Sequence, residues 1–126
     1  MELTKPITYF LTPGDVNTRR TFELARERAL ELEIKTILVA SSSGNTGALA
    51  AEFFTGFEVI VVSHSVGFRE ANLQELTDDN RKRIELLSGR ILTATHALGG
   101  VNRAIRRKFN TYQVDEIIAS TLKIFG

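Results

Sequence analysis

The residues best suited to chemistry form one short run, Ser-Ser-Ser-Gly-Asn-Thr at residues 41–46, which follows the apolar segment 36–39. The pattern after the run, at residues 48–54, predicts a helix. Backbone N–H groups at a helix N-terminus are unsatisfied and carry partial positive charge, so they attract phosphate or carboxylate groups. Hydroxyl side chains add hydrogen bonds, and glycine lets a ligand approach the backbone closely. The run therefore predicts an anion-binding loop.

Both histidines of the chain follow apolar segments in the same way. His64 comes directly after residues 59–62, and His96 comes shortly after residues 90–93. Because parallel strands place their carboxyl ends at one edge of a sheet, we expect both histidines to lie beside the anion-binding loop. Imidazole exchanges protons near neutral pH, so either histidine is a candidate general acid or base. The alternative is a structural histidine held by hydrogen bonds.

Further polar side chains follow the same predicted strand ends. Asn17 comes after the apolar segment 7–10, and Arg69 and Glu70 lie in the polar connection after residues 59–62. We expect Asn17 and Arg69 to surround the part of a ligand that extends beyond its anionic group. Glu70 or Arg69 would orient a catalytic histidine in an enzyme, and Glu70 is itself a catalytic candidate. The plainer alternative for this pair is a surface ion pair of little energetic weight.

The elements that position these residues alternate along the chain. Short apolar runs predict strands at 7–10, 37–40, 59–62 and 90–93, and helical spacing predicts helices at 17–33, 48–54, 77–87, 99–109 and 111–125. This alternation predicts a three-layer α/β/α fold, with a mainly parallel sheet of about four strands and helices on both faces. The β-branched run at 59–62 predicts a strand buried on both faces.

Size and composition indicate one domain over residues 1–126, with a net charge of +1 and no cysteine. The missing cysteines exclude disulfides, thiolate catalysis and cysteine-ligated metals, and we expect no metal site. The near-zero net charge disfavours a nucleic-acid partner. No apolar run approaches the roughly 20 residues of a membrane span, and the first residues lack a signal-peptide core. We therefore expect a cytoplasmic protein without a membrane partner.

A basic cluster on the predicted helix at 99–109 suggests a different class of function. Its cationic residues are Arg103, Arg106, Arg107 and Lys108. Such a cluster is typical of an interaction module that contacts RNA or an acidic partner, here through residues 102–108. No aromatic residues are interleaved with the cations to support base stacking.

Several motifs spread over nearly the whole chain resemble one known family. The order of strand, Ser-Ser-Ser-Gly-Asn-Thr and alanine-rich helix resembles the C-terminal α/β domain of pyruvate kinase. Stand-alone, mostly archaeal relatives of that domain share three more motifs. These are Tyr-Phe-x-x-Pro-Gly-x-x-Asn-Thr at residues 9–18, Gly-Phe-Arg-Glu at 67–70 and His-Ala-Leu at 96–98.

The resemblance implies a role for the loop. In many pyruvate kinases the equivalent loop holds the phosphate of a sugar-phosphate effector, and flavin mononucleotide (FMN) binding is suggested for the stand-alone relatives. Asn45 stands where many pyruvate kinases have a basic residue, which disfavours a doubly charged sugar phosphate. The residues that the resemblance implies for the phosphate are Ser41, Ser43, Gly44, Asn45 and Thr46. The shared sheet edge adds Asn17, His64, Arg69 and His96 around the rest of the ligand.

These observations lead us to expect a domain that binds a phosphorylated small molecule, either FMN or a sugar-phosphate-like effector. The alternatives are an enzyme that uses His64 or His96 as general acid or base, and a flavin-dependent oxidoreductase. The resembling proteins continue beyond the position of Gly126, which implies either a truncated chain or a sheet completed by a partner chain. An unpaired sheet edge would favour a homo-oligomer.

Overall fold

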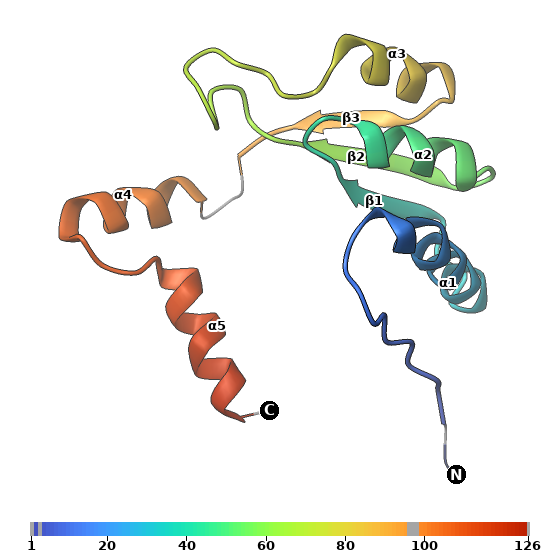
Figure 1. The fold of residues 1–126 in the computed structure, drawn as a ribbon, viewed down its shortest axis with the longest axis horizontal. Helices are drawn as coiled ribbons and strands as arrows, with labels where there is room; N and C mark the ends of the chain where they lie inside the picture. Colours follow the sequence, from blue (N-terminus) through green and yellow to red (C-terminus); the bar gives the residue numbers. More distant parts are fainter. Residues whose placement is uncertain (1, 3, 96–98, 126) are drawn as a thin grey trace.

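The computed structural model describes residue 2, residues 4–95 and residues 99–125, and Figure 1 shows their arrangement. Its elements agree with those predicted from Asn17 onward to within about one helical turn. In chain order they are η1 (Asp15–Asn17), α1 (Thr18–Glu31), β1 (Thr36–Ala40), α2 (Asn45–Phe53), β2 (Glu58–Ser63), α3 (Asp78–Leu86), β3 (Arg90–Thr93), α4 (Gly99–Phe109) and α5 (Val114–Phe125).

The strand predicted at residues 7–10 is wrong. This segment is irregular and exposed, with Ile7 at 74% and Tyr9 at 83% of full exposure. A strand needs a hydrogen-bonded neighbour, and none of the strands in the described ranges pairs with this segment. An ion pair between Lys5 and Glu31 ties the segment to the end of α1 instead. Among the residues that the structure describes, the sheet therefore has three strands rather than about four.

The sheet is parallel throughout, with the strand order β1-β2-β3. Each successive strand is added on the same side of the previous one. Because the crossovers are right-handed, both connecting helices then lie on the same face of the sheet. Accordingly α2 contacts β1 and β2, and α3 contacts β3 and α2. The predicted α/β class with a mainly parallel sheet is confirmed. Because the order does not reverse among the described strands, the carboxyl edge here has no switch point of the doubly wound kind.

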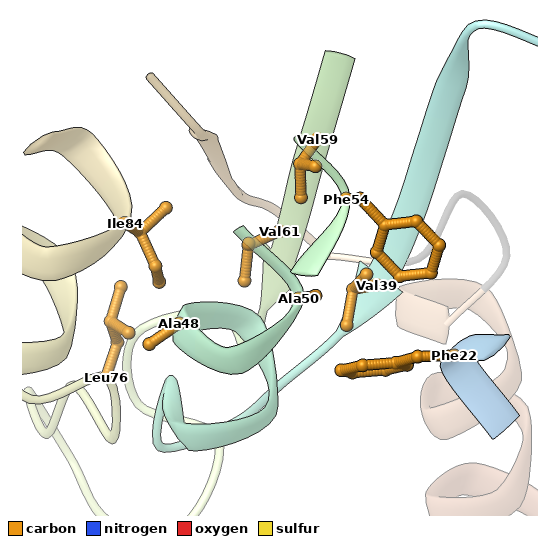
Figure 2. Packing of buried hydrophobic residues seen from close by; sticks show 9 residues of the cluster. All are labelled: Phe22, Val39, Ala48, Ala50, Phe54, Val59, Val61, Leu76 and Ile84. Carbon is orange, nitrogen blue, oxygen red and sulfur yellow. The ribbon is translucent and has the colours of Figure 1, made fainter. Parts of the chain in front are cut away.

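The core lies between the sheet and these two helices. Val39 and Val61 project from the strands toward α2, and Ile84 of α3 closes the other side, as Figure 2 shows. Phe22 brings α1 into this core, with its ring centroid 5.2 Å from that of Phe54. The helix α2 approaches β2 closely at Gly47, where an added Cβ would lie 2.5 Å from Cγ1 of Val61.

The opposite side of the sheet, here called the open face, consists of Leu38, Ile60, Val62 and Leu92. Leu38 keeps 69% of its full exposure and Leu92 keeps 50%, while Ile60 and Val62 are half-buried. The predicted burial of β2 on both faces is therefore wrong. A run of β-branched residues favours strand formation, but it does not determine whether both faces of the strand are buried. The handedness and direction of the crossovers decide on which face of the sheet the helices pack.

The last two helices form a pair beyond the end of β3. In the part of the chain that the structure describes, α5 contacts α4 and no other element. Arg106 of α4 lies 3.9 Å from the carboxylate of Glu116 on α5. The apolar side chains of α5, among them Ile117 and Leu122, are exposed. Figure 1 shows this pair to one side of the sheet.

Candidate functional site

The loop at residues 41–46 connects the carboxyl end of β1 to the N-terminus of α2. Ser41 is buried, and its Oγ accepts a hydrogen bond of 3.1 Å from the backbone N–H of Gly47. The Ser41 hydroxyl therefore caps one of the otherwise unsatisfied donors of α2. Gly44 adopts a left-handed conformation with φ of 93°, which favours glycine.

The first turn of α3 holds this loop in place. The buried Asn80 side chain donates from Nδ2 to the carbonyl of Ser43 at 3.1 Å and to Oδ1 of Asn45 at 2.7 Å. The backbone N–H of Thr77 donates to the same Ser43 carbonyl at 3.2 Å. A Cβ at Gly44 would lie 2.5 Å from Leu76 and 2.6 Å from Asn80. The loop thus has a fixed shape that depends on close packing of Gly44.

Several donors of the loop remain available. The backbone N–H groups of Ser43, Gly44 and Thr46 form no hydrogen bond with any residue that the structure describes. The Asn45 N–H has only a long contact of 3.5 Å to the hydroxyl of Ser43. Unpaired N–H groups before a helix N-terminus are suited to bind an anion.

His64 lies directly beside this loop, as the sequence predicts. Its Nε2 is 3.2 Å from the hydroxyl of Ser42, and its Nδ1 is 2.7 Å from Oε2 of Glu75. The side chains of His64 and Glu75 keep 37% and 21% of their full exposure, so the group is accessible to solvent. A hydroxyl, an imidazole and a carboxylate therefore form one hydrogen-bonded row.

The imidazole also packs against an aromatic ring, which in turn lies near a cation of α4. The ring of Phe68 lies 4.3 Å from that of His64, centroid to centroid. The guanidinium of Arg103, from α4, lies 5.6 Å from the Phe68 ring. Two further cations of the basic cluster have intramolecular partners, since Arg106 pairs with Glu116 and Lys108 lies over the ring of Phe109.

The position of Glu75 is fixed by its neighbour Gln74. The Gln74 amide donates to the carbonyl of His64 at 3.4 Å and accepts from the N–H of Leu76 at 3.0 Å. Neither Ser42 nor Glu75 was predicted as a site residue. Ser42 lies inside the predicted loop, so the sequence could have identified it as a site residue. Glu75 is separated from His64 by a polar connection whose path the sequence does not reveal.

The other predicted site residues are not brought to the loop in the same way. Asn17 donates from its amide to the carbonyl of Thr12 at 2.5 Å, at the start of α1. Arg69 and Glu70 are exposed, and the structure shows no hydrogen bond from either side chain to a described residue. His96, the remaining candidate, lies outside the described residues.

Two general properties complete the description. Within residues 4–95 and 99–125, no group of three or more histidine, aspartate or glutamate side chains is arranged to hold a metal ion. None of the helices in the same ranges is both long and apolar enough to cross a membrane.

One carboxylate far from the loop has a shifted pKa. At the amino end of the sheet, hydrogen bonds from Arg90 and then Thr36 lower the pKa of Glu58 below its ordinary value.

The family of this chain follows from its sequence and agrees with the fold. The sequence model of the family described as "Pyruvate kinase, alpha/beta domain" matches residues 19–125. The chain therefore belongs to the pyruvate kinase α/β domain family, and the resemblance inferred from its motifs is confirmed at the level of the domain.

Proposed function

We propose that this domain binds a phosphorylated small molecule at the carboxyl edge of its sheet. The observation that supports the proposal is the set of N–H groups at Ser43, Gly44 and Thr46 that bond with no described residue, in a loop that α3 holds in one shape. A site that already has its binding shape loses little conformational entropy when the ligand binds. The polar N–H groups and the α2 dipole favour the dianionic or monoanionic phosphate over a neutral group.

The ligand class is FMN or a sugar-phosphate-like effector. The N–H groups of the loop are suited to the phosphate of either ligand. A flavin ring also needs a flat apolar surface, and Phe68 is the aromatic residue beside His64, where it already contacts Arg103. FMN would supply redox chemistry when bound, and these residues would only orient it. Mass spectrometry of small molecules that copurify with the protein distinguishes the two ligands.

Three narrower assignments belong to the same proposal. The motifs at residues 9–18, 67–70 and 96–98 support kinship with the stand-alone, archaeal-type relatives of the domain. The composition, without cysteine, supports a cytoplasmic location. The exposed apolar residues of α5 support a homo-oligomer.

Replacing Thr46 with aspartate tests phosphate binding without loss of the fold. A carboxylate in the first turn of α2 is compatible with the helix dipole, yet it repels a phosphate. Ligand at about 100 times its dissociation constant should stabilise the native protein by about 2.7 kcal/mol, measured by thermal unfolding with FMN or ribose 5-phosphate. We expect Thr46→Asp to abolish this stabilisation.

The matched control is Gln113→Asp, which places the same charge at the N-terminus of α5. This variant should keep the stabilisation, because its charge is far from the loop in sequence and on another helix. Riboflavin and ribose, which lack phosphate, should have no effect. Equal stabilisation by the phosphorylated and unphosphorylated compounds, or undiminished affinity in Thr46→Asp, would contradict the proposal.

A further inference from the structure

Ser42, His64 and Glu75 form a row that has the composition of a catalytic triad. The Ser42 hydroxyl lies 3.2 Å from Nε2 of His64, and Nδ1 of the same ring lies 2.7 Å from the Glu75 carboxylate. In serine hydrolases the imidazole uses one nitrogen to accept the serine proton and the other to donate to an orienting carboxylate. Both contacts are made here by opposite nitrogens of one ring, as that role requires.

The backbone around Ser42 also matches the context of a nucleophile. Residues 40–44 read Ala-Ser-Ser-Ser-Gly, so Ser42 is followed two positions later by a glycine. The segment runs from the end of β1 through a tight turn into α2, and Gly44 supplies the left-handed residue of that turn. Gly-x-Ser-x-Gly turns between a strand and a helix present the serine in α/β-hydrolases, and here alanine replaces the first glycine. The strand–turn–helix order of the motif is therefore present, with the left-handed residue at Gly44 and not at Ser42 itself.

Donors for a developing oxyanion lie next to the serine. The N–H groups of Ser43 and Gly44, the two residues after Ser42, bond with none of the described residues. In acyl transfer the N–H of the residue after the nucleophile is a usual oxyanion donor. The nearby N-terminus of α2 adds partial positive charge.

We infer that the domain is a serine hydrolase of carboxylic esters, with Ser42 as nucleophile and His64 as general base. The Ser42 oxygen attacks the ester carbonyl carbon while its proton passes to Nε2 of His64. The intermediate then collapses, the C–O bond to the alcohol breaks, and the leaving oxygen takes that proton. Water then attacks the acyl carbon while its proton passes to Nε2 of His64. The bond between that carbon and the Ser42 oxygen breaks, the carboxylic acid leaves, and the proton on Nε2 returns to the Ser42 oxygen.

Glu75 is a positioning residue in this scheme, since it acts through His64. Its carboxylate fixes the ring orientation and stabilises the imidazolium that forms transiently. Gln74 bonds to both His64 and Leu76, which holds Glu75 at the right distance. The ring of Phe68 packs against the imidazole at an interplanar angle of 43° and restrains it further.

A fluorophosphonate probe and p-nitrophenyl acetate test this inference on the full chain. The probe should modify the native protein once, and peptide mapping should place the adduct on Ser42 among the chain's serines. We expect Ser42→Ala to lose labelling and to lower ester hydrolysis to the rate of the free imidazole. Ser120→Ala, which removes an exposed hydroxyl on α5, should behave as the unmodified protein.

The role of Glu75 has its own readout. Glu75→Gln should lower kcat by on the order of 10²- to 10⁴-fold with KM little changed, because it removes an interaction that strengthens in the transition state. A structural role alone would instead lower thermal stability and leave kcat per folded molecule intact. Circular dichroism of each variant checks that it is folded.

Two results would overturn the inference: absence of fluorophosphonate labelling of the folded native chain, or labelling and hydrolysis that persist in Ser42→Ala. Neither result bears on phosphate binding, which depends on the Thr46→Asp comparison. The two proposals therefore fail separately.

Discussion

The two faces of the sheet are built from the same kinds of residue and have opposite surroundings. Val61 and Val62 are adjacent on β2, yet Val61 is fully buried under α2 and α3 while Val62 is half-buried on the open face. Both crossovers advance in one direction, so both helices lie on one side. The apolar residues of a strand therefore do not reveal which face of the sheet is covered by helices. The order of the strands reveals it.

The largest expected effect comes from shortening the two adjacent valines. Val61→Ala should lower the free energy of unfolding by about 2–4 kcal/mol, since it removes two buried methyl groups and leaves a cavity. Val62→Ala makes the same chemical change on the open face and should cost under about 1 kcal/mol. Urea denaturation measures both. Equal costs would mean that a further surface covers the open face in solution.

A smaller effect is expected where α2 touches the covered face. Gly47→Ala adds a Cβ that would lie 2.5 Å from Val61, so the free energy of unfolding should fall by about 1–3 kcal/mol. Gly100→Ala is the control, because an added Cβ there meets nothing within 4 Å. Combining Gly47→Ala with Val61→Ala should cost less than the sum of the two changes, since the smaller residue relieves the clash. Strict additivity would rule out this contact as the cause.

The smallest expected effect concerns pH and the polar end of the open face. Hydrogen bonds from Arg90 and Thr36 lower the folded-state pKa of Glu58. Its contribution to stability is therefore present above the unfolded pKa and is lost as the pH falls through the folded one. Between about pH 6 and pH 3 the urea midpoint should fall slightly more for the native chain than for Glu58→Gln. A steeper fall in the variant would contradict the sign of this shift.

Much of the fold could be predicted from the sequence because the signals are local. The cap at Thr77, whose hydroxyl accepts from the Asn80 N–H, and the apolar period of α5 each depend on a few adjacent residues. The segment at residues 7–10 has the same local appearance as a strand, but strand formation requires a partner. Pairing is a non-local property, which explains why this prediction was wrong.

The candidate site was predicted in part for the same reason. The rule that parallel strands end at one edge was sufficient to bring His64 to the loop at residues 41–46. It could not select Glu75 over Glu70, because both lie in one polar connection and its turns decide which carboxylate returns to the imidazole. It also could not show that the Ser41 hydroxyl caps α2 and that the Ser42 hydroxyl faces His64.

The side chain of Asn80 decides whether the loop at residues 41–46 would keep its conformation when transferred to another protein. Its amide joins two groups of residues that are 35 to 37 positions apart in the chain, and Gly44 packs against its Cβ. The motif at residues 41–46 is thus only half of the structure that gives it shape. A fragment or graft that ends with α2 would carry the sequence of the loop without its conformation. The smallest transferable unit runs from β1 through the first turn of α3.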